Sequence, residues 1–190
     1  MIFKPASGYT PVILTKKKVQ GNYLRNSFFA PVNREAVAQG EKKICQEFKG
    51  RVQFKVHDFF KEQPVKDADV YLLRHTLHDW SNKYAIKILK GLIPALKYGS
   101  KIVINDRIIP DFGETHYLLE RESRDFDFYI FALTNAQERT LLDWENLLRD
   151  TDPRLKMTRV ARPKKSLLIC LWRILMIVRR WGSSAGVMEM

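Results

Sequence analysis

Ionisable side chains follow three segments whose pattern is typical of buried β-strands. They are HDFF at residues 57–60, RHTLHDW at residues 74–80 and NDR at residues 105–107. Ligands of open parallel sheets bind outside the carboxyl ends of the strands, so we expect these groups on one edge of a sheet. Such a set suits a flat cationic or polar cofactor and a substrate that loses a proton. His78 is the natural base, because an unperturbed imidazole titrates at about 6.5. A histidine at a strand end is also commonly a hydrogen-bonded structural residue, and the spacing leaves both interpretations open.

The segments around these groups predict a βαβ unit. Residues 51–56 alternate as a strand does, and residues 69–74 contain the continuous apolar run of a strand that is covered on both faces. Ser81 can cap a helix with a full apolar stripe, and Gly99 ends it in a left-handed turn. Residues 101–105 follow as another buried strand, so the crossover between the two strands is predicted to be right-handed.

The C-terminal part predicts one helix and two more strands. Thr140 and Asp143 are spaced to cap a short helix that buries Trp144, Leu147 and Leu148 and ends before residue 152. Residues 155–160 and 166–172 are predicted to be strands. The sequence therefore indicates an α/β fold with helices on a mostly parallel sheet.

Composition and charge exclude several classes of protein. The chain has 190 residues, and 45% of them are hydrophobic, enough for a packed core in a single domain. The formal charge is +12, but residues 1–30 contribute +5 and residues 151–190 contribute +7, whereas the residues between them are neutral. This distribution argues against a nucleic-acid-binding face. Cys45 and Cys170 have neither a disulfide pattern nor metal-ligand spacing, so a reduced intracellular protein without a metal site is expected.

The ends of the sequence carry no targeting signal that we recognise. The N-terminal apolar run is too short for a signal peptide. The longest apolar stretch, residues 166–178, is shorter than the roughly 20 residues that span a bilayer. It predicts a terminal β-strand, with an interfacial membrane helix as the alternative. A cytoplasmic location is expected, and membrane association is not.

From about residue 51 to residue 172 the sequence resembles the C-terminal part of class I S-adenosylmethionine-dependent O-methyltransferases of plant and fungal secondary metabolism. The resemblance rests on RVQFKVHDFF, DADVYLLRHTLHDWSNKYAIKIL, KIVINDRIIP, NAQERTLLDW and TDPRLKM, in this order and spacing. It implies a partial Rossmann-like methyltransferase sheet with helices on both faces and S-adenosyl-L-methionine as cofactor. The implied substrate is a hydroxyl group of a small aromatic or polyketide-like metabolite.

The resemblance also implies catalytic roles for three residues. His78 matches the base that removes the proton of the substrate hydroxyl, while Asp106 and Glu138 match acids that flank and orient the histidine. Two acids around one imidazole would hold its tautomer and favour its protonated form. Two alternatives stay open: Asp106 pairs with a neighbouring arginine, or Glu138 only caps the helix that follows Thr140.

Three further residues match positions at the family's cofactor site. Asp58 and Phe59 match the pair that contacts the adenine, and Arg74 matches a basic residue. The alternative for Asp58 and Phe59 is a strand terminus followed by a core aromatic residue.

The N-terminal part departs from the family. No Gly-x-Gly occurs in the sequence, so the glycine-rich cofactor loop and the first strand are missing. Residues 28–40 look like the remnant of the next strand and helix, with Val32 where an acid normally binds the ribose and Asn33 as a weak substitute. The helical domain through which the family dimerises is also absent. The expected organisation is an irregular basic arm (1–27), a partial methyltransferase catalytic domain (28–172) and a basic tail (173–190).

The leading hypothesis is O-methylation of a small hydroxylated molecule, and the alternative is a catalytically silent protein that binds a pathway intermediate or a partner.

Overall fold

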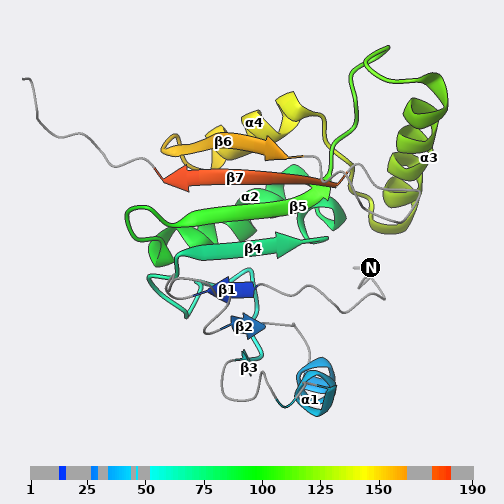
Figure 1. Ribbon diagram of the computed structural model, residues 1–190. Helices are drawn as coiled ribbons and strands as arrows, with labels where there is room; N and C mark the ends of the chain where they lie inside the picture. The colour runs from blue at the N-terminus through cyan, green and yellow to red at the C-terminus, as the bar shows by residue number, and fades with distance from the viewer. Residues whose placement is uncertain are drawn as a thin grey trace, which may run out of the picture.

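The computed structural model describes residues 13–15, 27–29, 34–43, 46, 52–161 and 173–180 (Figure 1). Seven strands form one sheet in the order β3-β2-β1-β4-β5-β7-β6. The strands are β1 (Ile13–Thr15), β2 (Ser27–Phe29), β3 (Val52–Phe54), β4 (Val70–Arg74), β5 (Lys101–Arg107), β6 (Leu155–Ala161) and β7 (Arg173–Arg180). The helices are α1 (Arg34–Lys43), α2 (Asn82–Leu92), α3 (Tyr117–Thr134) and α4 (Leu141–Thr151), with short 3-10 helices η2 (Leu77–Asp79) and η3 (Ile93–Ala95).

Five of the seven strands share one direction, and this determines which loops meet. β2 and β3 are parallel, as are β4 and β5. β1 runs antiparallel to both β2 and β4, and β7 runs antiparallel to both β5 and β6. The carboxyl ends of β3, β4 and β5 therefore lie at the same edge of the sheet, at the right in Figure 1. The predicted α/β fold is confirmed, and the sheet is mixed: five strands share one direction, but four of the six neighbouring pairs in the described sheet are antiparallel.

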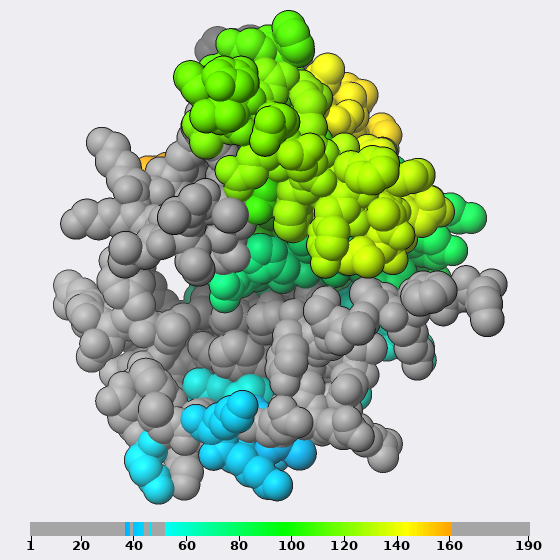
Figure 2. Space-filling view, turned by 90° about the vertical axis from the view of Figure 1, so that its right-hand side faces the viewer, coloured from blue at the N-terminus to red at the C-terminus, as the bar shows by residue number. Residues whose placement is uncertain are grey.

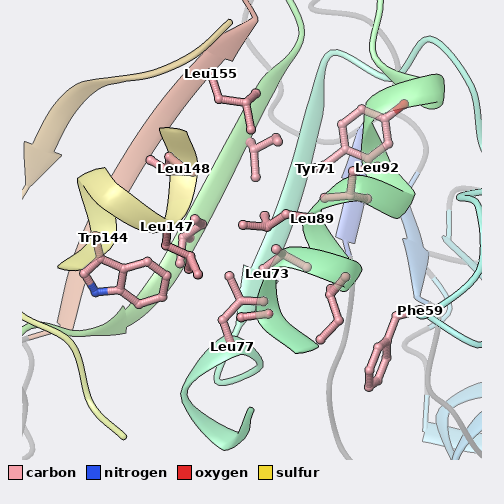
Figure 3. Close-up of a cluster of buried hydrophobic side chains, with 14 of the residues drawn as sticks. Phe59, Tyr71, Leu73, Leu77, Leu89, Leu92, Trp144, Leu147, Leu148 and Leu155 are labelled. Carbon is pink, nitrogen blue, oxygen red and sulfur yellow. The ribbon is translucent and has the colours of Figure 1, made fainter. Parts of the chain in front are cut away.

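The hydrophobic core lies between the sheet and the helices α2 and α4. The predicted apolar stripe of α2 packs against β4 and β5, and α4 lies beside α2 on the same face (Figure 3). The fully buried side chains include Tyr71, Leu73, Leu77, Ile88, Leu89, Ile102, Ile104, Trp144 and Leu148. On the opposite face of the sheet, Val70, Leu72 and Val103 are half-buried. Burial against α2 and α4 thus fixes the register of β4 and β5, and with it the position of the loops at their carboxyl ends.

Local signals place the ends of the helices. Ser81 occupies the N-cap position of α2, although its side chain makes no capping hydrogen bond. α2 gives way at residue 93 to η3, which contains Pro94, and Gly99 follows with a φ of 83°. At the start of α4, Thr140 and Asp143 form the predicted capping box, and Trp144 is fully buried.

The two ends of the chain differ from the prediction. Residues 1–27 are predicted as an irregular arm, but Ile13–Thr15 forms the three-residue strand β1 between β2 and β4. β1 runs antiparallel to both neighbours, and the absence of the family's first strand with its glycine-rich loop stays a prediction. The predicted basic tail, residues 173–190, is corrected in the same way, since Arg173–Arg180 forms β7. Its apolar centre pairs with β5 on one side and with β6 on the other, which explains why it joins the sheet despite its terminal arginines. Residues 166–172, Val32, Asn33 and both cysteines lie outside the described residues.

Helix α3 is not predicted from the sequence. It stands at the carboxyl edge of the sheet, and Figure 2 shows this edge from the front. There α3, coloured green to yellow, lies directly above the loop that follows β4. This arrangement brings the segment after α3 next to the ends of β4 and β5.

Candidate active site

The loop that follows β4 places His78 beside the carboxyl end of β5. His75 adopts a left-handed conformation with a φ of 48°, and its backbone N–H donates to the carbonyl of Asn105 at 3.2 Å. Leu77 is fully buried in the core, so η2 is anchored by the residue immediately before His78. The His78 side chain is therefore held in an interior position, and only 8% of the residue is exposed.

Glu138 orients the imidazole of His78. Its Oε1 lies 2.9 Å from His78 Nδ1, and both residues are buried. The backbone N–H of Glu138 donates to Asp127 Oδ1 of α3 at 2.7 Å, which fixes the segment between α3 and α4. The alternative that Glu138 caps the next helix is not observed, because Thr140 and Asp143 form the capping box of α4.

Asp106 lies beneath the same loop. It is fully buried at the end of β5, and its Oδ2 accepts a hydrogen bond from the backbone N–H of Leu77 at 3.2 Å. Its neighbour Arg107 stacks on the ring of Phe126, with 3.7 Å between the guanidinium carbon and the ring centre. Asp106 therefore supports η2 through the backbone and places a carboxylate near the imidazole.

Opposite charges in a buried setting shift the pKa values of these groups. Burial by itself lowers the pKa of His78, but the hydrogen bond to Glu138 and the charges of Asp106, Glu138 and Asp79 together raise it to about 9. Burial raises the pKa of Asp106 to about 6, and burial also raises the pKa of Asp79. The site thus favours a protonated histidine surrounded by carboxylates.

Arg139 holds the loop of residues 75–80, here called the histidine loop, in place, a role that the sequence alone did not reveal. Its fully buried guanidinium donates from Nη1 to the carbonyl of Leu77 at 2.9 Å and from Nη2 to the carbonyl of Trp80 at 2.7 Å. Its Nε donates to Asn82 Oδ1 at 2.9 Å. Glu138 and Arg139 therefore act together, the first on the imidazole and the second on the backbone on both sides of it.

The predicted cofactor residues lie around the same edge of the sheet. Asp58 is exposed, and its Oδ1 accepts the backbone N–H of Phe60 at 3.0 Å. Phe59 is 9% exposed and belongs to the core (Figure 3). Its ring lies 5.8 Å from the ring of Trp80. Arg74 is exposed at the end of β4. The loop after β3 thus approaches the histidine loop through aromatic contacts.

A glycine in α2 allows this approach. The carbonyl of Gly91 accepts the backbone N–H of Gln63 at 2.9 Å. A Cβ atom at Gly91 would lie 2.7 Å from the carbonyl oxygen of Lys61. The lack of a side chain therefore lets the segment that follows Asp58 and Phe59 lie directly on the helix.

A hollow of about 520 Å³ adjoins the site between the start of α2 and α3. Its lining residues are Ser81, Asn82, Arg124, Asp127, Phe128, Phe131, Asn135, Ala136 and Gln137. Two of them contact the segment between α3 and α4, since Asn82 accepts a hydrogen bond from Arg139 and Asp127 accepts one from Glu138. Two of these nine side chains are aromatic and six are polar or charged, so the hollow offers a small organic molecule both ring contacts and hydrogen-bond partners.

Residues 34–152, more than half of the chain, match the family model of the O-methyltransferase domain. The chain belongs to the O-methyltransferase family. The matched range includes His78, Asp106 and Glu138, and it begins with α1 and ends just after α4.

Curated relatives come from fungi. The O-methyltransferase AMT9 of Alternaria alternata is 44% identical over 115 residues, which cover 60% of this chain and 27% of the relative. The O-methyltransferase fsr2 of Gibberella fujikuroi is 36% identical over 163 residues, which cover 86% of this chain and 42% of the relative. This member of the family thus spans between about a quarter and two fifths of the length of these two relatives.

Solved structures share the fold. The structure of LepI in complex with SAM has a TM-score of 0.68 at 21% identity and covers 85% of this chain and 37% of that chain. The O-methyltransferase NcsB1 from neocarzinostatin biosynthesis, in complex with S-adenosylmethionine and 2-hydroxy-5-methyl naphthoic acid, has a TM-score of 0.64 at 17% identity. It covers 82% of this chain and 42% of that chain. The α/β fold described above is therefore shared with these two solved structures.

Proposed function

We propose that this chain acts in S-adenosylmethionine-dependent methylation of a hydroxyl group on a small aromatic or polyketide-like secondary metabolite, with His78 as the general base. The main support is the contact of 2.9 Å between His78 Nδ1 and Glu138 Oε1, buried beside Asp106 at the carboxyl edge of the sheet. Fungal relatives that are named O-methyltransferases support the reaction class.

The side chains of this site suit proton removal from a hydroxyl. Glu138 holds Nδ1, so Nε2 of His78 is the nitrogen that takes the proton. Asp106 and Glu138 then stabilise the imidazolium that forms. With a pKa of about 9, His78 is mainly protonated at neutral pH, so its basic form is the minor one and we expect the rate of methylation to rise with pH toward about 9. Much of the remaining catalysis comes from aligning the substrate oxygen with the methyl group, a task for the rigid loop that Arg139 clamps.

The cofactor residues fit this proposal in different ways. Asp58 and Arg74 are exposed at the carboxyl edge, where a ligand can reach their charges. Phe59 contributes the small exposed part of its ring, while the rest supports the loop in the core. When bound, the cofactor supplies a methyl group on a sulfonium sulfur. In the proposal, Asp58, Phe59 and Arg74 hold the part of the molecule remote from that sulfur.

The absence of Gly-x-Gly from the sequence favours a second candidate. In this alternative the chain binds a pathway intermediate or a partner through the same edge without transferring a methyl group. Loss of several cofactor hydrogen bonds, each worth about 0.5 to 1.5 kcal/mol, would lower affinity for the methyl donor by orders of magnitude.

Calorimetric titration with S-adenosylmethionine and with S-adenosylhomocysteine separates the two candidates. Micromolar binding supports the methyltransferase, and a folded protein that binds neither compound supports the silent protein. In an active preparation, His78→Ala should abolish methylation of a hydroxylated aromatic substrate while cofactor affinity stays nearly unchanged. The control is His116→Ala, which replaces an exposed histidine at the start of α3 and should leave methylation intact. Full activity of His78→Ala would refute the assignment of the base.

A further inference from the structure

Three potential metal ligands meet at the carboxyl ends of β4 and β5. His75, His78 and Asp106 each offer one ligand atom, and these atoms lie within 4.8 Å of one another. His75 and His78 lie in the loop that follows β4, and Asp106 lies near the end of the neighbouring strand β5. The sequence predicts no metal site, because these residues have no recognised spacing and Asp106 lies about 30 positions beyond the two histidines.

One carboxylate oxygen in this cluster is available to a ligand. Asp106 is fully buried, and its Oδ2 is used by the backbone N–H of Leu77. Among the described residues, its Oδ1 has no hydrogen-bond partner, although it is also buried. A buried carboxylate oxygen without a donor is costly, and a bound cation would remove this cost.

The hydrogen bond to Glu138 orients His78 to bind a metal ion through Nε2. Because Nδ1 of His78 contacts Glu138, its Nε2 is the nitrogen that remains for coordination. A histidine ligand whose other nitrogen is hydrogen-bonded to a carboxylate is the usual arrangement in protein metal sites. Glu138 thus has the position of the outer carboxylate, and it is itself held by Asp127.

The charge around the cluster suits a divalent cation. Besides Asp106 and Glu138, Asp79 contributes a carboxylate whose Oδ1 lies 3.5 Å from His78 Nε2. Two arginines are buried nearby: Arg139 donates to two backbone carbonyls and to Asn82, and Arg107 stacks on Phe126. Three carboxylates therefore lie near two imidazoles and two guanidinium groups.

We propose that His75, His78 and Asp106 bind Zn²⁺ or a similar transition-metal ion, with Glu138 as the outer carboxylate. Two imidazoles and one carboxylate are a ligand set that zinc accepts, with a fourth position for water. Bonds of about 2.0 to 2.2 Å place tetrahedral ligands about 3.4 Å apart, so donors spread over 4.8 Å must close by up to about 1.4 Å on binding. The site does not depend on the proposed methyl transfer. The expected effect of the metal on activity does depend on that proposal. A metal ion bound to His78 Nε2 occupies the nitrogen that would take the substrate proton, so zinc should inhibit the enzyme.

Cobalt titration of the chelator-treated full chain tests the site. Co²⁺ should produce absorption bands of a low-coordinate complex at one equivalent, and Zn²⁺ should displace it. His75→Ala should weaken Co²⁺ binding at least tenfold, and Glu138→Gln should weaken it by about 10-fold to 100-fold. The matched controls are His116→Ala and the pair Cys45→Ser and Cys170→Ser, which should bind Co²⁺ as the unmodified chain does.

Each outcome decides the proposal. His75 is the key position, because its replacement removes a ligand without touching the proposed base, and circular dichroism confirms that the variant is folded. No cobalt spectrum, or equal affinity in a folded His75→Ala variant, would overturn the site. Binding that disappears in the cysteine variants would also overturn it. Cofactor binding is measured separately, so a failure of the methyltransferase proposal leaves this result unaffected.

Discussion

Replacement of Glu138 by Gln probes the electrostatic design of the site most directly. The substitution removes one negative charge at 2.9 Å from His78 Nδ1 and keeps an oxygen that can accept the Nδ1 proton. A single opposite charge within about 4 to 6 Å shifts a pKa by about 1 to 3 units. Since the pKa of His78 is about 9, we expect Glu138→Gln to lower it by about 2 units, to about 7. This corresponds to about 3 kcal/mol of differential interaction between the two protonation states.

NMR titration of histidine-labelled protein measures this pKa without requiring enzymatic activity. The chain has four histidines, so a His78→Gln sample assigns the signal. Glu62→Gln is the control, because its side chain is exposed and pairs with Lys66 away from the site. A His78 pKa in Glu138→Gln within about half a unit of the unmodified value would refute the assignment of Glu138 as the main partner.

Three further predictions concern stability. Arg139→Lys should lower the free energy of unfolding by about 2 to 4 kcal/mol in urea denaturation, because lysine cannot replace three directed hydrogen bonds; the exposed Arg149→Lys should change it by less than about 0.5 kcal/mol. Gly91→Ala should destabilise the protein by about 1 to 3 kcal/mol despite better helix propensity, since its Cβ meets the carbonyl of Lys61; an unchanged or higher melting temperature would contradict this close contact. The pKa of His78 in the folded protein lies above its ordinary value of 6.5, so the histidine stabilises the fold fully below pH 6.5 and loses this effect as pH rises to about 9. The free energy of unfolding should therefore fall by an amount on the order of 3 kcal/mol over this range. His78→Gln should not show this fall.

The sequence predicts those parts of the fold whose signals are local. The apolar stripe of α2 and the capping box of α4 each lie within a dozen residues, and both are confirmed. The grouping of His78 and Asp106 was also predictable, because it follows from the rule that parallel strands bring their carboxyl ends together. Glu138 was assigned from the resemblance, and the structure places it at His78. Their catalytic roles stay predictions.

Other features have no local signal. Helix α3 exposes Tyr117, Phe128, Tyr129 and Phe131, so its apolar residues do not form one stripe and the usual periodicity is hidden. Arg139 bonds to groups 57 to 62 positions earlier in the chain, a contact that only the folded arrangement reveals. β1 joins the sheet through pairing with β2 and β4, which neither composition nor spacing indicates. The terminal strand predicted within residues 166–178 overlaps β7 at residues 173–178.

The place of β7 in the sheet has a consequence for biosynthesis. β6 is made before β7, although β7 is the strand with which it pairs in the described sheet. β7 also pairs with β5 on its other side. Until residues 173–180 leave the ribosome, β5 and β6 each have an open hydrogen-bonding edge. Such edges are templates for pairing with other chains, so the nascent protein is most prone to aggregation just before its last strand is inserted. Insertion of β7 is then the step that closes the sheet, and ribosome-bound chains ending before residue 173 should be markedly more protease-sensitive than chains in which residue 180 has emerged.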